Sequence, residues 1–353
     1  MNLHELNAVI TDAVNMHQIP GACYAYVTKD TVKLGDAGFR QIVPEKLPVA
    51  ADTIYDMASC TKVISTTTLA LQLMEQGCFS LSTPLQTILP DFSHPEVTIE
   101  QIMTHTSGIC PDDKGYRTCH TKQEMWDFFK NKPLEFTPGT KVLYSDFGYI
   151  ALGFVIEKFA GPLDQLAARN IFTPLDMKDT GYQPKLHGLA ERCAATEVTE
   201  ARGVIVGECH DGKGYCLNGI SGNAGLFSTT EDLSHYVQMI LLDGIWHGKR
   251  ILNSSSVEML KHSRTNGLNV QRTLGWISND PNQSDGHHIS DSCIYHTGFT
   301  GTSVYIDFQR QFGLILLTNR VHPTRDNASI MEIRNRFHDA AFAAYNHAKK
   351  AEL

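Results

Sequence analysis

The chain has 353 residues, which at about 150 residues per domain corresponds to two domains, or to one large domain with an insertion. Charged residues make up 19% and hydrophobic residues 42%, a usual globular composition that excludes a disordered or coiled-coil protein. The 30 Lys and Arg against 38 Asp and Glu give a net charge of −8. This charge argues against nucleic-acid and membrane-surface binding, because both need a basic surface.

The N-terminal segment has the pattern of an amphipathic helix rather than a signal peptide, because it lacks a basic start and a continuous apolar centre. Its apolar residues fall on one side: Leu3, Leu6, Val9, Ile10, Val14 and Ile19. No uncharged apolar run approaches ~18 residues, so no transmembrane helix is expected. Without an export signal, the nine cysteines are expected to be reduced thiols, Cys110 and Cys119 included. The protein is therefore predicted to be cytoplasmic.

Two strands at 22–28 and 32–38 are predicted next, and a short strand at 53–57 leads into a long helix at 59–76. Apolar or small residues lie on every side of this long helix, which is typical of a buried central helix. Short helices at 99–103, 122–129 and 147–159 then alternate with loops rich in Pro and Gly.

The C-terminal part follows a glycine-rich segment at 217–227, where a capping-box pattern at Ser228–Glu231 predicts a helix to about Leu242. Strands are predicted at 274–278, 294–296, 302–308 and 312–319, and a last helix at 329–348. Strands at both ends and helices in the middle predict an α+β fold, with one antiparallel sheet flanked by helices. Residues 1–77 and 207–353 would form the sheet domain, and residues 78–206 an inserted, mostly helical domain.

The clearest candidate for chemistry is Ser59-Cys60-Thr61-Lys62, at the start of the buried helix. Residues three apart share one helix face, so the Ser59 hydroxyl can meet the Lys62 amine. A lysine can take the serine proton only if its pKa falls from ~10.4, and burial near an electropositive helix N-terminus favours such a fall. Ser59 is the candidate nucleophile and Lys62 the candidate base. The alternative is an N-cap serine beside a solvated lysine.

A second motif, Tyr144-Ser145-Asp146, precedes the helix predicted at 147–159. A tyrosine at this place can relay protons between the nucleophile and the leaving group. The structural alternative makes Tyr144 a half-buried aromatic residue and Asp146 the cap of the next helix, and Asp146 can also do both.

A third motif, His296-Thr297-Gly298, ends a predicted strand. The backbone N–H of Phe299 then lies where it can point, together with the N–H of Ser59, at a developing oxyanion. Taken alone, this triplet indicates little more than a strand followed by a turn.

In this order, the three motifs resemble those of the serine β-lactamase and penicillin-binding-protein superfamily, which begin with S-x-x-K and end with a K-T-G-type triplet. The resemblance is closest to the class C β-lactamase and D-alanyl-D-alanine carboxypeptidase branch, which includes esterases. It covers nearly the whole chain and includes Tyr55–Ala58, Thr104–Gly108 and Gly222–Ser228. The implied fold is β-lactamase/transpeptidase-like, in agreement with the elements above. The resemblance implies catalytic roles for Ser59, Lys62 and Tyr144, and substrate contacts for Asp146, His296, Thr297 and Gly298.

Two residues depart from the family pattern. Asp146 stands where the family usually has Asn, and an ionised carboxylate can only accept hydrogen bonds. His296 stands where many penicillin-recognising members have Lys, and histidine is mostly neutral at pH 7. Both changes make the pocket less positive, which weakens the case for a dedicated β-lactamase.

No cofactor or metal is predicted. Gly219, Gly222 and Gly225 lack the frame of a phosphate-binding loop. His287-His288 and the Cys209-His210…Cys216 segment lack the usual spacing of metal ligands. Cys60 is a poor thiol nucleophile because the sequence offers it no identifiable partner histidine.

The sequence therefore predicts a serine acyl-transfer hydrolase with an acyl-enzyme on Ser59. Its small-molecule substrate would be an ester, or a D-amino-acid amide or peptide, and β-lactamase activity would be weak or absent. The alternatives are a true class C-like β-lactamase or D,D-carboxypeptidase, and a non-catalytic binding protein on the same scaffold. Specificity is expected to lie in the loops at 112–120 and 266–272, and the sequence gives no indication of the oligomeric state.

Overall fold

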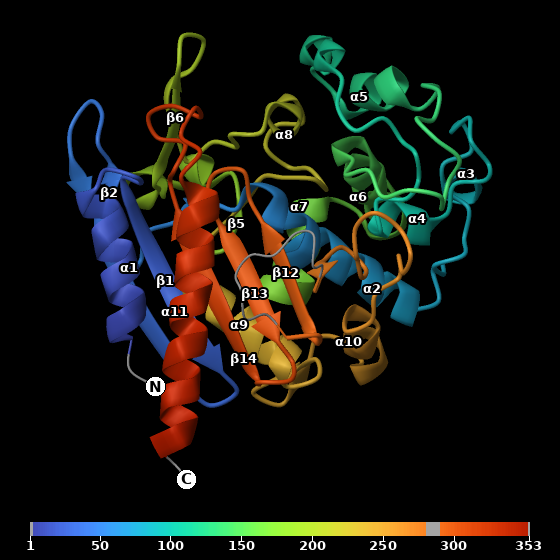
Figure 1. The fold of residues 1–353 in the computed structure, drawn as a ribbon. Helices are drawn as coiled ribbons and strands as arrows, with labels where there is room; N and C mark the ends of the chain where they lie inside the picture. Colours follow the sequence, from blue (N-terminus) through green and yellow to red (C-terminus); the bar gives the residue numbers. More distant parts are fainter. Residues whose placement is uncertain (1–2, 280–289, 352–353) are drawn as a thin grey trace.

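The computed structural model describes residues 3–279 and 290–351, and its central feature is a seven-stranded sheet (Figure 1). The strand order is β11-β12-β13-β14-β1-β2-β3, and each pair of neighbours is antiparallel. The strands are β1 (Gly21–Thr28), β2 (Val32–Gln41), β3 (Leu47–Pro48), β11 (Ile277–Ser278), β12 (Cys293–Thr297), β13 (Ser303–Asp307) and β14 (Phe312–Thr318). Because β1 pairs with β14, the two ends of the chain meet inside one sheet, which confirms the predicted antiparallel α+β fold.

Alternate side chains of the sheet enter two separate cores, as the period of two in a strand requires. Tyr24 and Leu316 pack with Leu6 of α1 (His4–Asn15) and Phe337 of α11 (Ile330–Ala351). These two helices run side by side across one face of the sheet (Figure 1). Residues of the opposite parity, such as Ala25 and Ile315, join the larger core on the other face, where α9 (Thr230–Leu241) packs.

The remaining elements form the helical part of the molecule and small sheets beside it. Its α-helices are α2 (Thr68–Glu75), α3 (Leu85–Ile88), α4 (Ile99–Met103), α5 (Lys122–Phe129), α6 (Asp146–Ala160), α7 (Leu163–Ala167), α8 (Gly212–Cys216) and α10 (Ser254–Leu260). Further turns are η1 (Ala58–Cys60), η2 (Lys62–Thr67), η3 (Lys114–Thr118), η4 (Ala168–Phe172), η5 (Pro184–His187) and η6 (Ala190–Arg192). The short strands are β4 (Tyr55–Asp56), β5 (Gly181–Tyr182), β6 (Ala195–Thr199), β7 (Gly203–Val206), β8 (Leu226–Ser228), β9 (Ile245–Trp246) and β10 (Lys249–Arg250).

The long helix predicted at 59–76 is not uniformly α-helical. It begins with the 3-10 turn η1, continues as the π-helical stretch η2 and becomes the α-helix α2 only at Thr68. The Thr68 hydroxyl donates to the Val63 carbonyl at 3.2 Å, so the first residue of α2 satisfies a carbonyl of η2 with its side chain. This segment is buried on all sides, as predicted, and π-helical turns often mark functional sites.

Two further local predictions shift by a few residues. The N-cap of α9 is Thr229, whose side chain accepts the Asp232 N–H, because Ser228 still belongs to β8. Strand β11 begins at Ile277 rather than at 274, because Gly275 turns with φ +82° and donates to the Met103 carbonyl. The division into domains at 77 and 206 remains a prediction.

All nine cysteines lie in the described part of the chain and are free thiols. None of the described helices is both long and apolar enough to cross a membrane. Within residues 3–279 and 290–351, no group of three or more His, Cys, Asp and Glu is placed to hold a metal ion. His287 and His288 lie outside the described residues.

Candidate active site

Ser59 lies in η1, at the junction between strand β4 and the buried central helix. The preceding residue, Ala58, has φ +45°, a conformation that a residue with a side chain rarely adopts. The Asp56 carboxylate holds this turn by accepting the N–H groups of Ala58 and His210, each at 2.7 Å. A strained backbone persists only where its surroundings fix it, and such residues cluster at active sites.

Lys62 is fully buried, and its ammonium group makes three hydrogen bonds. It donates to Ser59 Oγ at 3.2 Å, to Asp146 Oδ1 at 2.8 Å and to the Asn223 carbonyl at 2.9 Å. Burial works to lower the pKa of Lys62, but the charge of Asp146 and the contact with Tyr144 outweigh it, so this pKa lies above its ordinary value. The prediction of a lowered pKa is therefore wrong, because the sequence does not show that a carboxylate lies beside the lysine.

Asp146 is the first residue of α6 and bridges two lysines. Besides Lys62, its carboxylate accepts a hydrogen bond from Lys213 of α8 at 3.1 Å. Burial works to raise the pKa of Asp146, yet the two lysines hold it below the ordinary value. The alternative in which Asp146 caps α6 is wrong, because the cap is Ser145, whose hydroxyl accepts the Gly148 N–H.

The side chain of Tyr144 stands beside this lysine. Lys62 Nζ lies 4.7 Å from the centre of the Tyr144 ring, and the ring packs on His105 with centroids 4.5 Å apart. Its hydroxyl is buried and has no hydrogen-bond partner of ordinary geometry in the described part of the chain. Burial raises the pKa of Tyr144 above its ordinary value although Lys62 opposes this, so the phenol is neutral and keeps its proton.

His296, Thr297 and Gly298 lie at the end of β12, where the sequence predicted them. His296 is buried, and its Nδ1 donates to the Thr297 carbonyl at 2.9 Å, which leaves Nε2 as an acceptor with no partner among the described residues. Burial, Arg272 and Lys62 together hold the pKa of His296 well below its ordinary value. The histidine is therefore neutral, and it offers no positive charge to a substrate carboxylate.

Gly298 packs closely on the backbone that precedes Ser59, so the third motif lies next to the serine. A side-chain carbon added to Gly298 would lie 2.1 Å from Thr302 Oγ1 and 2.6 Å from the Met57 carbonyl oxygen, so only glycine fits. The following residue, Phe299, lines the same cleft as Ser59 and is 48% exposed.

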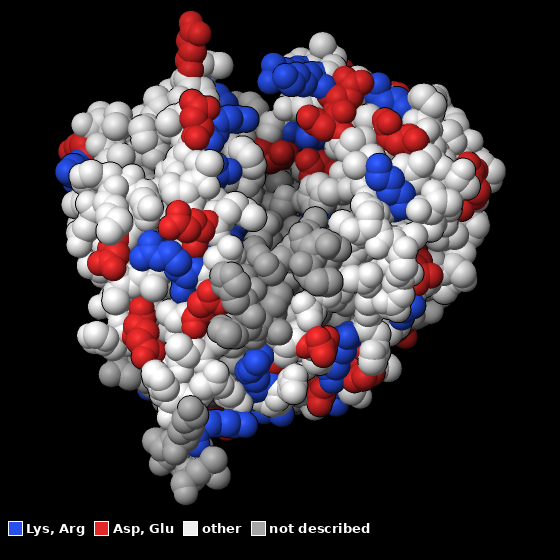
Figure 2. All heavy atoms as spheres, in the orientation of Figure 1, with Lys and Arg blue, Asp and Glu red and all other residues white. Residues whose placement is uncertain are grey.

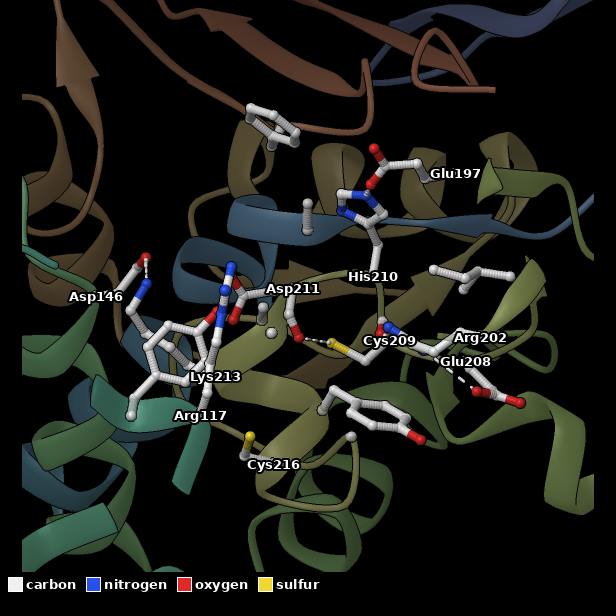
Figure 3. Close-up of a pocket in the computed structure, with 18 of the residues that line it drawn as sticks. Arg117, Asp146, Glu197, Arg202, Glu208, Cys209, His210, Asp211, Lys213 and Cys216 are labelled. Carbon is white, nitrogen blue, oxygen red and sulfur yellow. Dashed lines mark hydrogen bonds and ion pairs between the residues drawn. The ribbon is translucent and has the colours of Figure 1, made fainter. Parts of the chain in front are cut away.

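A cleft of about 1250 Å³ opens over these residues. Ser59, Tyr144 and Asp146 lie on its wall, and Figure 2 shows acidic and basic side chains together around the hollow. Figure 3 shows Asp146, Lys213 and Arg117 at one end of the cleft and Glu197, His210 and Arg202 toward the other. Catalytic groups on the wall of a mixed polar and apolar cleft fit an enzyme that acts on a small molecule.

Sequence reasoning missed three residues that complete the site. Lys213 contacts Asp146, Asn223 offers its carbonyl to Lys62, and Arg272 lies with its guanidinium carbon 5.5 Å from the centre of the Tyr144 ring. Asn223 lies in the glycine-rich segment that contributed to the family resemblance, so a signal for it existed. Lys213 is marked by no motif, and Arg272 was only part of a loop expected to set specificity.

Two other candidates from the sequence are less reactive. Cys60 is buried, with its thiol directed at the His296 carbonyl at 3.5 Å, and burial raises the pKa of Cys60 to about 11. Cys209 is also buried, and burial raises its pKa well above the ordinary value. Neither is a thiolate at neutral pH, and the thiolate is the nucleophilic form.

A serine hydroxyl in contact with a buried lysine and next to a neutral tyrosine, at the wall of a cleft, fits the active site of a serine hydrolase. Residues 6–335 match the Beta-lactamase family, and the chain belongs to this family.

Named relatives agree with this assignment. The chain is 29% identical over 304 residues to an N-acetylmuramyl-L-alanine amidase of Bacillus subtilis, covering 76% of this chain and 68% of the relative. It is 30% identical over 315 residues to a putative D-alanyl-D-alanine carboxypeptidase of Escherichia coli, covering 80% and 72%. A class C β-lactamase from Rhodobacter sphaeroides has the same fold, with a TM-score of 0.74, 18% identity and coverage of 96% and 99%. The resemblance inferred from the three motifs is therefore confirmed.

Proposed function

We propose that this protein hydrolyses small neutral esters, and D-amino-acid amides more slowly, through an acyl-enzyme on Ser59. The observation that carries the proposal is the 3.2 Å contact between Lys62 Nζ and Ser59 Oγ at the wall of the cleft. A buried, charged lysine beside a serine hydroxyl favours negative charge on that oxygen, which a nucleophile needs in order to attack a carbonyl.

Tyr144 serves in this mechanism as the proton relay. Because Lys62 holds its proton and donates to Ser59 Oγ, it is not the acceptor of the serine proton. As the bond between Ser59 Oγ and the acyl carbon forms, the serine proton passes to Tyr144 Oη. In the same step the phenolic proton passes to the leaving oxygen, whose bond to the acyl carbon breaks when the tetrahedral intermediate collapses. The neutral phenol accepts one proton and donates another, so it ends the step unchanged, and water repeats the sequence to release the acid.

The oxyanion of the tetrahedral intermediate is held by backbone N–H groups of Ser59 and Phe299 in this proposal. The close approach of Gly298 to Met57 and Ala58 supports it, because that approach brings the following peptide beside Ser59. Donors fixed in advance stabilise the charge as it develops, without reorganising during the reaction.

The preference for a neutral substrate is inferred from two features of the cleft. His296 carries no charge, so the usual place of a carboxylate-binding lysine is neutral. Three exposed apolar side chains line the cleft, Leu186 at 75%, Phe299 at 48% and Tyr215 at 47% exposure. An apolar wall of this kind fits an acyl or alkyl group.

A D-amino-acid peptidase is the second candidate, and a different observation favours it. Lys114 and Arg117 lie on η3 at the edge of the cleft and are exposed. They can attract a carboxylate from outside the catalytic centre. The carboxypeptidase named among the 30% identical relatives agrees with such a substrate. A binding protein without catalysis is less consistent with the intact set of Ser59, Lys62 and Tyr144.

One preparation assayed with p-nitrophenyl acetate and butyrate, nitrocefin and D-alanyl peptides tests the proposal. Ester hydrolysis by the wild type, its loss in Ser59→Ala and a single fluorophosphonate adduct on Ser59 by mass spectrometry are the expected results. An adduct on Cys60, or hydrolysis unchanged by Ser59→Ala, would overturn the proposal. Faster turnover of D-alanyl peptides than of esters would favour the second candidate.

A further inference from the structure

Two buried arginines hold the turn at 298–302, which connects β12 to β13 next to the serine. Arg334 of α11 donates through one guanidinium nitrogen to the Gly298 carbonyl at 3.1 Å and to the Thr302 carbonyl at 2.7 Å. Arg320, just after β14, donates through Nε to the Phe299 carbonyl at 2.9 Å. The Gly298 carbonyl and the carbonyl of Phe299 itself, on either side of the Phe299 side chain, thus each accept a hydrogen bond from a guanidinium group.

The same turn is tied to the segment in front of Ser59. The Thr300 hydroxyl donates to the Asp56 carbonyl at 2.7 Å, and the Thr302 hydroxyl donates to the Met57 carbonyl at 3.1 Å. The turn is therefore fixed between the arginines on one side and the backbone just before the nucleophile on the other.

Burying these cationic groups costs free energy of folding, which indicates that they have a role beyond packing. Arg334 is 4% exposed and Arg320 8% exposed. Burial and the nearby Arg325 lower the pKa of Arg320, and Glu197 only partly opposes this. Buried charges disfavour folding unless they are well hydrogen-bonded, and both guanidinium groups direct donors at backbone carbonyls of this region.

The geometry of one peptide unit connects Arg334 to the reaction. The Gly298 carbonyl and the Phe299 N–H belong to the same planar trans peptide, so they point in opposite directions. The Gly298 carbonyl also accepts the Gly301 N–H at 3.0 Å, so the charged donor of Arg334 acts together with this backbone contact in fixing the direction of the Phe299 N–H. Hydrogen bonds in a chain also polarise one another, so the same contact makes the N–H a stronger donor.

We propose that Arg334 is a positioning residue that orients and polarises the Gly298–Phe299 amide, so that the Phe299 N–H binds the oxyanion of the tetrahedral intermediate. Arg320 fixes the next carbonyl of the same turn. This inference rests on the proposed function, because it assumes acyl transfer on Ser59. Removing one oxyanion donor outright slows catalysis by about 10²–10³-fold. Removing the support of one donor should slow it less, by about 10-fold.

Kinetics and the affinity for a transition-state analogue test this role together. Arg334→Met is expected to lower kcat for p-nitrophenyl butyrate by about 10-fold, with KM nearly unchanged. It should weaken inhibition by phenylboronic acid, which forms a tetrahedral adduct on a serine, by the same factor. Arg336→Met, on the same helix, is the matched control and should leave both values as in the wild type. A fall in thermal stability without these changes, or a change confined to KM, would overturn the proposal.

A second variant covers the case in which Arg334→Met does not fold. Arg334→Gln keeps a polar side chain, and added guanidinium ion at low, non-denaturing concentration should restore part of its kcat, whereas tetramethylammonium should not. Absence of rescue in a folded Arg334→Gln protein whose kcat is reduced would also overturn the proposal. If the wild type is active and the Arg334 variants keep its kcat and its inhibition by phenylboronic acid, only this inference is contradicted. A wild type that neither hydrolyses esters nor is acylated on Ser59 contradicts the proposed function and this inference together.

Discussion

Replacing Asp146 by asparagine, the residue more usual in the family at this position, tests the charge state of the site. The carboxylate of Asp146 contacts Lys62 at 2.8 Å and Lys213 at 3.1 Å, and these three side chains are 18%, 0% and 7% exposed. Asn keeps the size and one acceptor but removes the negative charge. Lys62 would then be a buried cation bound only to neutral groups among its described contacts.

The expected loss of stability follows from this burial. Removing one partner of a buried ion pair costs about 3–5 kcal/mol. The remaining amide oxygen and the second partner of Lys213, Asp112 at 2.7 Å, should reduce the loss to about 2–3 kcal/mol. With an unfolding entropy of about 2.1 cal/mol/K per residue, a loss of this size lowers Tm by about 3–4 °C. Asp112→Asn is the matched control, because the Asp112 side chain is 57% exposed and its pair contributes little.

The pH dependence of Asp146→Asn separates the two roles considered for Lys62. In the wild type, the raised pKa of Lys62 means that the pair stabilises the fold below the ordinary lysine pKa and that this contribution is lost as pH rises through the raised value. In the variant, the charge of Asp146 no longer opposes the effect of burial, so the pKa of Lys62 falls toward the assay range.

If a charged Lys62 supports the Ser59 oxygen, as proposed, the rate of ester hydrolysis by Asp146→Asn, relative to that of the wild type at the same pH, will decline as pH rises from 7 to 9. Stopped assays with p-nitrophenyl butyrate and thermal melts on the same samples measure both effects. A rate that increases over this range would show that neutral Lys62 acts as the base. A Tm equal to that of the wild type would refute the assigned ion pair.

Three further predictions concern the same cleft. Tyr144→Phe should reduce kcat for p-nitrophenyl butyrate by about 10²–10⁴-fold. The Tm should stay near the wild-type value, because the hydroxyl makes no hydrogen bond of ordinary geometry with the described residues. Near-normal turnover would exclude Tyr144 as the proton relay. His296→Lys should lower the activation free energy of nitrocefin hydrolysis relative to that of ester hydrolysis by up to about 1–3 kcal/mol. An unchanged ratio of the two rates would assign His296 a structural role. The pKa values of His105 and His296 are lowered by burial, so their contribution to stability is present above about pH 6.5 and is lost as pH falls. Melts from pH 7.5 to 5.5 should show decreasing Tm with a smaller decrease in His296→Gln, and equal pH dependence in both proteins would contradict this.

Much of the fold was predictable because the signals are local. The strands near each end alternate or run apolar over a few residues, and the buried central helix is apolar on every side. The changes within that helix were not predictable from local sequence, since the π-helical stretch at 62–67 packs against distant segments, for example through the hydrogen bond from Thr66 Oγ1 to the Gly222 carbonyl at 2.8 Å. Gly222 lies 156 residues further along the chain, and no window of sequence contains both groups.

The sequence by itself determined the family, the candidate nucleophile and the presence of Lys62 one helical turn after Ser59. Only the tertiary structure decided how these groups are charged. Asp146 lies 84 residues from Lys62 in the chain, and Lys213 lies 67 residues beyond Asp146; folding brings the three into one buried network. Arg334 of α11 likewise reaches the Gly298 carbonyl, 36 residues earlier in the chain. A pKa depends on burial and on charges within a few ångströms, and those neighbours are set by the packing of distant segments rather than by the order of residues.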